Sequence, residues 1–219
     1  LLDLVEDSGR LLLIMELVDG LELHDYVRHA ASEPALEAPS FDELRVRSAF
    51  LQLAQALYAL HADRKVHRDV KPSNVRVTPE GRAVLLDLDL SVDLDAEMSE
   101  SSWPGELRPV GTAPYMAPEQ ASSGPTTLAS DWYSFGVVLY EALTGVLPFR
   151  GTDLEILLTK QEVAPTPAEE LVPSVPHDLA TLCRDLLLAQ PAQRPLGVEV
   201  LRRLGLEEET VSQRLSLAS

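Results

Sequence analysis

The first forty residues change from a continuous apolar run to a periodic pattern. Residues 11–18 (LLLIMELV) are almost all apolar and follow a turn-like Asp-Ser-Gly at 7–9. A run of this length, bounded by turn residues, predicts a buried strand. Residues 21–31 have helical spacing, whereas residues 32–39 contain two prolines and predict a loop.

The clearest helical pattern lies between Ser40 and Ala62. Ser40, with Glu43 three residues later, has the residue types of a capping box at a helix start. Beyond it, side chains suited to a core recur every three or four residues, which places them on one face of a helix. They are Val46, Phe50, Leu53, Ala54, Leu57 and His61. We therefore expect one long helix with this face against a core.

The middle of the chain predicts a hairpin followed by a loop. Two β-like runs, 75–78 and 83–88, flank a proline- and glycine-containing turn at 79–82. Residues 89–106 carry six acids and four serines but no lysine or arginine, so we expect a mobile surface loop there. Helical patterns separated by proline-rich loops follow at 128–143, 153–161, 177–188 and 198–204.

Composition excludes several classes of protein. The chain has 219 residues, of which 45% are hydrophobic, and can bury a core without disulfides. Its single cysteine, Cys183, favours a reducing cytoplasm, and its helical surroundings predict a small buried hydrophobe. The net charge of -17 disfavours nucleic acid and anionic membranes as partners. The apolar stretch at 132–149 is interrupted by polar residues, which favours a core helix over a membrane span.

The residue types that carry chemistry gather at 67–74 (HRDVKPSN). This stretch supplies a carboxylate at Asp69, an ammonium at Lys71 and an amide at Asn74. Phosphoryl transfer needs a group that orients the attacking hydroxyl, cations that offset the phosphoryl charge, and oxygen ligands for magnesium. Each residue alone would more often be a solvated surface group. Together in one loop, they indicate phosphoryl transfer.

Further segments follow this loop in a recognisable order. They are LLDLD at 85–89, GTAPYMAPEQ at 111–120, SDWYSFG at 130–136 and QRP at 193–195. In order and spacing, the chain resembles the eukaryotic-type serine/threonine protein kinases, especially their bacterial members, over nearly its whole length. The resemblance implies an α+β, protein-kinase-like fold, mainly the helical C-lobe with the last N-lobe strands and the hinge. It divides the chain into the end of the N-lobe and hinge (1–18), the C-lobe (19–204) and a tail or linker (205–219).

The resemblance also implies roles for the residues of the phosphate site. Asp69 would be the catalytic base and Lys71 the cation near the transferred phosphate. Asn74 and Asp87 would hold Mg2+. Because Lys71 follows Asp69 by two residues, as in the serine/threonine branch, the expected activity is transfer of the ATP γ-phosphoryl group to a serine or threonine hydroxyl of a protein.

A second set of residues is expected to bind the nucleoside. Met15 would be the gatekeeper, while the Glu16 carbonyl and the Val18 amide would bond the adenine. Glu22 matches a position that contacts the ribose. The cofactors implied are ATP and Mg2+. The partners are a protein substrate and, because the first residue is Leu1 and not methionine, further domains of a longer chain.

The resemblance finally assigns structural roles. Thr112 would bond the base and Lys71, Glu119 would pair with Arg194, and Asp131 would bond the backbone of the catalytic loop. His67 would be scaffolding without a role in proton transfer.

The chain departs from the family pattern at three places. Asp89 and Leu88 replace the glycine and phenylalanine of Asp-Phe-Gly. Arg76 stands where the family has an apolar residue under the adenine, and it either stacks on the base or points to solvent. The chain contains no glycine-rich loop and no strand lysine. Acids of the 89–106 segment are expected to substitute partly for phosphate against Arg68, so that the segment is ordered without phosphorylation.

Two other functions remain as alternatives. A pseudokinase that acts as a scaffold or ATP-binding regulatory module would explain Asp89 and Arg76. A small-molecule phosphotransferase of the aminoglycoside-kinase type shares a histidine-x-aspartate loop. The Ala-Pro-Glu at 117–119 and the helix of Asp131 argue against the latter, because the resemblance gives them a role in building a platform for protein substrates.

Overall fold

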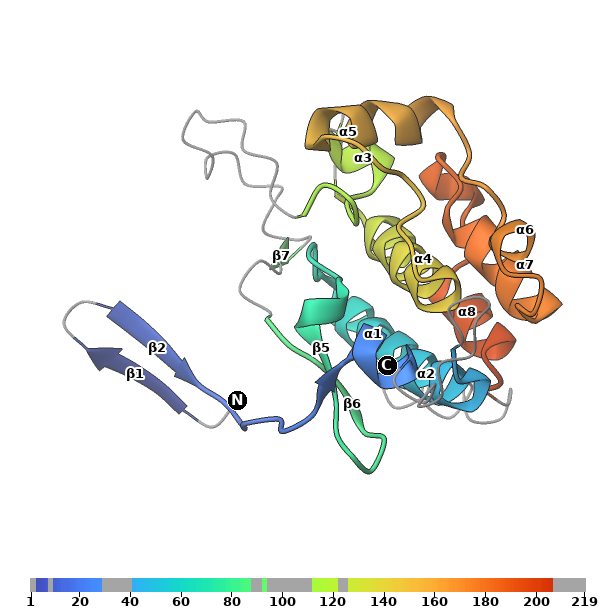
Figure 1. The fold of residues 1–219 in the computed structure, drawn as a ribbon. Coiled ribbons are helices and arrows are strands. Elements are labelled where there is room, and N and C mark those ends of the chain that lie inside the picture. The colour runs from blue at the N-terminus through green and yellow to red at the C-terminus, as the bar shows by residue number, and fades with distance from the viewer. Residues whose placement is uncertain are drawn as a thin grey trace.

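The computed structural model describes residues 3–7, 10–28, 41–87, 92–93, 112–121 and 126–206. The strands are β1 (Asp3–Asp7), β2 (Arg10–Ile14), β3 (Leu21–Glu22), β4 (Lys65–Val66), β5 (Val75–Val77), β6 (Ala83–Leu85) and β7 (Val92–Asp93). The α-helices are α1 (Leu23–Arg28), α2 (Glu43–Ala62), α3 (Pro118–Ala121), α4 (Leu128–Thr144), α5 (Asp153–Glu162), α6 (Ala168–Leu171), α7 (His177–Leu186) and α8 (Gly197–Arg203). Helices form the body, the strands lie along one side, and the expected α+β class is confirmed (Figure 1).

Within the described parts of the chain, the strands form three small antiparallel sheets. β1 pairs with β2, β3-β5-β6 form a second sheet, and β4 pairs with β7. The predicted hairpin is confirmed as β5–β6, although β6 ends at Leu85. In this sheet Glu22 of β3 lies opposite Arg76 of β5, which brings the hinge region beside the segment that follows the catalytic loop.

The expected buried strand at 11–18 is only partly right. β2 ends at Ile14, and the chain then runs irregularly to Asp19. Met15 and Leu17 are 45% and 90% exposed, so the expected burial is wrong for this part of the run. Figure 1 shows the β1–β2 hairpin projecting away from the helical body, which leaves these side chains without a covering helix among the described residues.

The acidic segment at 89–106 lies mostly outside the described residues. Within it, Val92–Asp93 form β7, opposite Lys65–Val66 of β4. This short pairing contradicts an entirely loop-like segment. A two-residue ladder is too short to show an alternating hydrophobic pattern, so the sequence gives no sign of it.

Helix α2 confirms the long helix but begins with a different cap. Its N-cap is Asp42, whose carboxylate accepts a hydrogen bond from the Arg45 amide at 3.0 Å. The expected cap, Ser40, lies outside the described residues. Aspartate is as good an N-cap as serine, and its charge also favours the positive end of the helix dipole. All six residues of the predicted face are buried.

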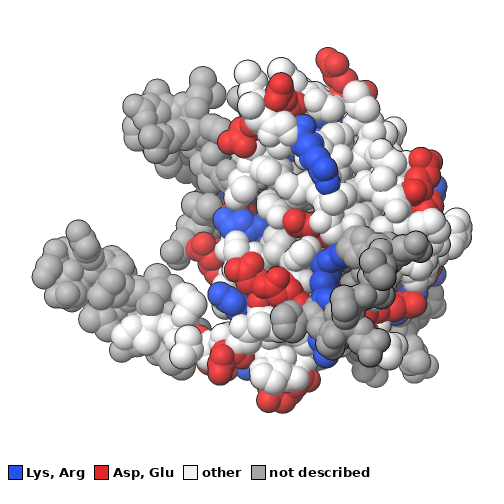
Figure 2. All heavy atoms as spheres, in the orientation of Figure 1, with Lys and Arg blue, Asp and Glu red and all other residues white. Residues whose placement is uncertain are grey.

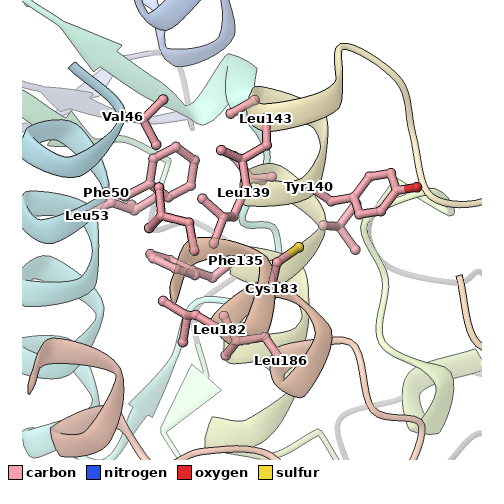
Figure 3. Packing of buried hydrophobic residues seen from close by; sticks show 14 of the residues in the cluster. Val46, Phe50, Leu53, Phe135, Leu139, Tyr140, Leu143, Leu182, Cys183 and Leu186 are labelled. Carbon is pink, nitrogen blue, oxygen red and sulfur yellow. The ribbon is translucent and has the colours of Figure 1, made fainter. Parts of the chain in front are cut away.

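The core lies where α2, α4 and α7 meet. Figure 3 shows Phe50 of α2 and Phe135 of α4 together, and their ring centroids are 5.3 Å apart, edge to face. A Cβ added to Gly136 would lie 2.7 Å from the Leu186 Cβ, so the glycine allows α4 and α7 to approach closely. Cys183 is buried in this core, as predicted, and burial raises the pKa of its thiol.

Helix α4 is the buried centre of the domain, as its apolar sequence predicts. It is surrounded by other helices (Figure 1), and across the described residues no helix is long and apolar enough to cross a membrane. The helices expected at 128–143, 153–161, 177–188 and 198–204 are present with ends shifted by at most two residues. The four-residue helices α3 and α6 were missed because one turn is too short to show a period.

Candidate functional site

Residues 67–74 form a loop between β4 and β5 whose shape is set by Asp131 of α4. The amides of His67 and Arg68 donate hydrogen bonds to the two carboxylate oxygens of Asp131, at 2.8 and 2.9 Å. His61 Nε2 lies 2.7 Å from the same carboxylate. Arg68 has a φ of 72°, a left-handed conformation that these bonds stabilise. The expected bond between Asp131 and the loop backbone is confirmed.

The loop brings the three expected phosphate-site residues together. Lys71 Nζ donates to Asp69 Oδ2, and Asn74 Nδ2 donates to the same oxygen at 3.0 Å and to the Asp69 carbonyl at 2.8 Å. Asp69 and Asn74 are buried, and Lys71 is partly buried. The Asp69 carboxylate is therefore oriented by two donors within its own loop, one of which is charged.

Two neighbours complete this cluster. Lys71 Nζ also donates to Thr112 Oγ1 at 3.4 Å, which confirms the lysine contact expected of Thr112. His67 is buried, with Nε2 3.0 Å from the Leu86 carbonyl. Its ring joins the catalytic loop to the end of the hairpin, which is a scaffolding position.

Asn74 and Asp87 are suited to hold a cation. Because the Asn74 amide nitrogen faces Asp69, its oxygen is the atom left for a metal. The Leu86 amide donates to the Asn74 carbonyl at 2.8 Å and so brings Asp87 next to this site. Asp87 is exposed and has a φ of 61°, a conformation that aspartate adopts more readily than most residues. Mg2+ needs only one or two protein oxygens when phosphates and water supply the others, so this pair fits it.

A cavity of about 480 Å³ lies beside the hinge and contains the expected adenine-binding residues. It is lined by Met15, Glu16, Leu17, Val18, Asp19, Gly20, Arg76 and Leu86. A Cβ on Gly20 would lie 2.3 Å from the Val77 carbonyl oxygen, so only glycine allows the hinge to approach β5 this closely.

Arg76 lies at this cavity, which bears on the two alternatives for it. Its Nη1 donates to the Gly20 carbonyl at 3.4 Å, and its side chain is partly buried. Its position at the cavity is the one that the first alternative, stacking on a base, requires. The Glu16 carboxylate instead pairs with Arg82 at 2.9 Å on the exposed turn of the β5–β6 hairpin. No local sequence signal indicates this pair, because its residues are 66 positions apart.

Glu22, which was expected to contact the ribose, does not line the hinge cavity, although it lies opposite Arg76 in the sheet. It lines a second cavity, of about 410 Å³, together with Lys71, Thr112 and Tyr115. The other lining residues are His24, Asp25, Pro72, Ser73 and Glu141. Acidic side chains lie beside basic ones near the centre of the face drawn in Figure 2. This second cavity opens next to Lys71 and is large enough to admit a side chain of a bound peptide.

Two residues of this second cavity were not expected from the sequence. The Tyr115 hydroxyl donates to Glu141 Oε2 at 2.7 Å, and burial together with this carboxylate raises the pKa of Tyr115. Tyr115 lies in the recognised GTAPYM segment, but nothing local links it to a glutamate on α4. The contact joins the wall of the cavity to the central helix.

The expected pair of Glu119 and Arg194 is present. Arg194 Nη1 and Nη2 donate to the two Glu119 oxygens at 2.7 and 2.8 Å. The other donors of the buried guanidinium reach three backbone carbonyls, at Ala129, Leu188 and Ala189. All five N–H groups are used, which is the condition for burying such a charge without a large penalty.

Fold and site define a protein kinase domain, and comparison with known proteins agrees. The family model for the protein kinase domain matches residues 1–203. The chain is 36% identical over 217 residues to serine/threonine-protein kinase PkaA of Streptomyces coelicolor, covering 95% of this chain and 36% of that protein. The chain belongs to the protein kinase family.

Other relatives are also protein kinases. Serine/threonine-protein kinase PknA of Mycobacterium tuberculosis is 36% identical over 185 residues, which is 83% of this chain and 39% of that protein. Human ribosomal protein S6 kinase alpha-3 is 32% identical over 203 residues, which is 90% of this chain and 25% of that protein. The chain thus spans less than two fifths of the length of these relatives.

Proposed function

We propose that this chain carries the phosphotransfer site of a serine/threonine protein kinase, which transfers the γ-phosphoryl group of ATP to a serine or threonine hydroxyl of a protein. The main support is the arrangement of the Asp69 carboxylate. It is buried, it is oriented by Lys71 and Asn74, and it lies next to a cavity that Lys71 lines. The family and the names of the relatives support the same reaction class.

In this proposal, Asp69 accepts the proton of the acceptor hydroxyl. The hydroxyl oxygen forms a bond to the γ-phosphorus while the bond from that phosphorus to the β–γ bridging oxygen breaks. Lys71 offsets charge on the phosphoryl oxygens, and its contact with Thr112 fixes where its ammonium lies. Asn74 and Asp87 would hold Mg2+, which neutralises phosphate charge when bound.

The hinge cavity would bind the base of ATP. The Glu16 carbonyl and Val18 amide would hydrogen-bond the adenine, with Met15 at the back and Arg76 against one face. Glu22 would serve the ribose from the neighbouring cavity. This assignment is supported by the volume of about 480 Å³ and by the four hinge residues that line it together with Arg76.

The proposed domain boundaries follow from the same resemblance to serine/threonine protein kinases. We assign residues 1–18 to the end of the N-lobe and the hinge, 19–204 to the C-lobe and 205–219 to a tail or linker. The longer relatives support further domains in the full-length protein. The one cysteine, buried in the core, is compatible with a cytoplasmic protein.

The two alternatives are less well supported. A pseudokinase is not favoured, because the Asp69 cluster is intact and the relatives are named as kinases. Its remaining motivation, Asp89, lies outside the described residues. A small-molecule phosphotransferase is disfavoured by the protein kinase family match over residues 1–203.

The test is transfer of labelled γ-phosphate from ATP and magnesium to a lysine-rich histone by the full-length protein. We expect transfer by the wild type and a loss of about 10²- to 10⁴-fold in Asp69→Asn, since a general base is removed. Asp178→Asn is the matched control, because Asp178 is exposed on α7. Its activity should equal that of the wild type.

The Asp89→Gly variant distinguishes two explanations for a lack of phosphate transfer by the wild type. Silence in the wild type with recovery in Asp89→Gly would mean that the altered metal segment prevents catalysis. Silence in both would reject the kinase proposal in favour of a scaffold.

A further inference from the structure

Lys160, in the last turn of α5, is a deeply buried charged residue that the site described above does not use. The residue is 2% exposed. Ile156 lies one turn earlier on the same buried face of α5, so the helix presents Lys160 toward the protein interior. Within the described residues, Lys160 makes no ion pair with a carboxylate.

The Lys160 ammonium is satisfied by backbone alone. Nζ donates to the carbonyls of Ala113, Pro114 and Met116 at 2.8, 3.2 and 2.7 Å. An ammonium has three N–H donors, so the three carbonyls use all of them. Nζ also lies 5.7 Å from the centre of the Tyr133 ring, which offers a weak additional attraction.

This arrangement costs free energy that an apolar side chain would avoid. Burial lowers the pKa of Lys160 to about 7, because the charged form loses its hydration. A leucine at this position would fill space without that cost. The residue type is therefore explained by what the ammonium holds and not by packing.

The segment held by Lys160 depends on it for its hydrogen bonds. The Thr112 carbonyl accepts from the amides of Tyr115 and Met116, at 2.9 and 3.2 Å. The Tyr115 carbonyl accepts from Ser134 Oγ at 2.8 Å. The three other carbonyls of residues 112–116 are those bound by Lys160. Without its ammonium, carbonyls in this buried turn would lose their partners.

The same segment carries two side chains of the phosphotransfer site. Thr112 bonds Lys71, and Tyr115 bonds Glu141; both line the cavity beside Lys71, whereas Lys160 does not. Lys160 therefore contacts the backbone of the cavity wall without touching the cavity itself.

We propose that Lys160 is a positioning residue for phosphotransfer, which fixes the backbone of residues 112–116 so that Thr112 and Tyr115 form the wall against which the protein substrate binds. This inference rests on the proposed kinase function. It assigns the role to helix α5, which carries none of the residues expected to bind ATP, metal or the acceptor hydroxyl. Its effect should fall on the protein substrate and spare ATP.

The experiment compares Lys160→Met with Gln161→Met in the full-length protein. Methionine keeps the length of the lysine stem and removes its donors, while Gln161 is the exposed neighbour on the same helix. We expect Lys160→Met to raise the KM for a lysine-rich histone about tenfold and to leave the KM for ATP within about twofold. Gln161→Met should change neither.

A change in the KM for the protein substrate without a change in the KM for ATP distinguishes a positioning role of Lys160 from a general effect on stability. A purely structural role would reduce the fraction of folded enzyme, which lowers the apparent kcat and leaves both KM values unchanged. Unchanged KM values in Lys160→Met would therefore overturn the proposal.

Hydrogen exchange gives a second measurement that needs no activity. In Lys160→Met, the amides of Tyr115 and Met116 should exchange faster, while those in the centre of α4 keep their wild-type rates. Unchanged exchange at 115–116 would overturn the positioning role even if activity fell. Absence of transfer by the wild type would instead contradict the proposed function, with the exchange result showing separately whether Lys160 holds the segment.

Discussion

The loop at 67–74 and the proposed hinge segment at 15–18 are held in opposite ways. The loop is fixed by a buried carboxylate, Asp131, which is 1% exposed and bonds two of its amides. The hinge has exposed side chains and is held by close backbone approach at Gly20 and by an exposed ion pair of Glu16 with Arg82. The residues proposed to perform chemistry are therefore positioned by buried hydrogen bonds, whereas those proposed to bind the base are positioned by the path of the backbone. Substitutions should therefore harm the first region more than the second.

The largest effect is expected at Asp131. Asp131→Ala removes the acceptor for the amides of His67 and Arg68 and the partner of His61. Loss of one member of a buried charged network should lower the free energy of unfolding by about 3–5 kcal/mol. Urea denaturation measures this change.

The matched control for this prediction is Asp178→Ala. The Asp178 carboxylate also makes two short contacts, with Arg47 at 2.7 and 3.0 Å, but both side chains are solvent-accessible. Such a pair contributes at most about 1 kcal/mol because water screens it. Equal losses in the two variants would remove burial as the reason for the sensitivity of the loop.

A smaller, pH-dependent effect is expected at Glu119. Burial raises the pKa of Glu119, but the hydrogen bond and charge of Arg194 outweigh this and hold the pKa below its usual value of 4.5. The ionised carboxylate therefore stabilises the fold above that pH, and the contribution is lost as the pH falls through the lower folded-state value. Glu119→Gln should cost about 1–3 kcal/mol at neutral pH and flatten the loss of stability in acid.

Urea midpoints at neutral pH and at steps below about 4.5 test this prediction. Glu199→Gln is the control, since Glu199 also pairs with an arginine, Arg202, but at the surface. If the free energy of unfolding fell equally steeply with decreasing pH in Glu119→Gln and in the wild type, Glu119 would have the same pKa in the folded and unfolded states, and the prediction would be wrong.

A moderate effect on nucleotide binding is expected at Arg76. Arg76→Met keeps an apolar stem at the hinge cavity and removes the guanidinium face. We expect the KM for ATP to rise about two- to fivefold, which corresponds to loss of a weak cation–π contact at a partly buried site. Arg82→Met, on the same hairpin but outside the cavity, should leave it unchanged. A fall in KM for Arg76→Met would show that the charge opposes nucleotide binding.

The smallest effect is expected at Glu16. Its carboxylate is exposed, and Arg82 lowers its pKa through a hydrogen bond and its charge. Glu16→Gln should leave the urea midpoint and the KM for ATP unchanged within error, because the Glu16 backbone carbonyl, and not the side chain, is proposed to bond the adenine. A clear rise in the KM for ATP would give the side chain a role in shaping the hinge.

Local pattern was sufficient for most of the helical body. The buried face of α2 has a 3.6-residue period, and α4 is apolar over most of its length, so their positions could be predicted from neighbouring residues alone. The same pattern gave a wrong prediction for Met15 and Leu17. Their apolar side chains suggested burial, but burial depends on a covering element, which no property of the run itself reveals.

In the candidate site, too, some features could be predicted from the sequence and others could not. The sequence alone determined the residue types at 67–74 and their order along the chain, since spacing within one loop is a local property. Only the tertiary structure decided that Arg76 lies at the hinge cavity, that Glu22 lines the other cavity, and that Lys160 holds the segment at 112–116. These contacts join residues that are far apart in sequence, and their energies depend on burial and mutual distance, which exist only once the chain has folded.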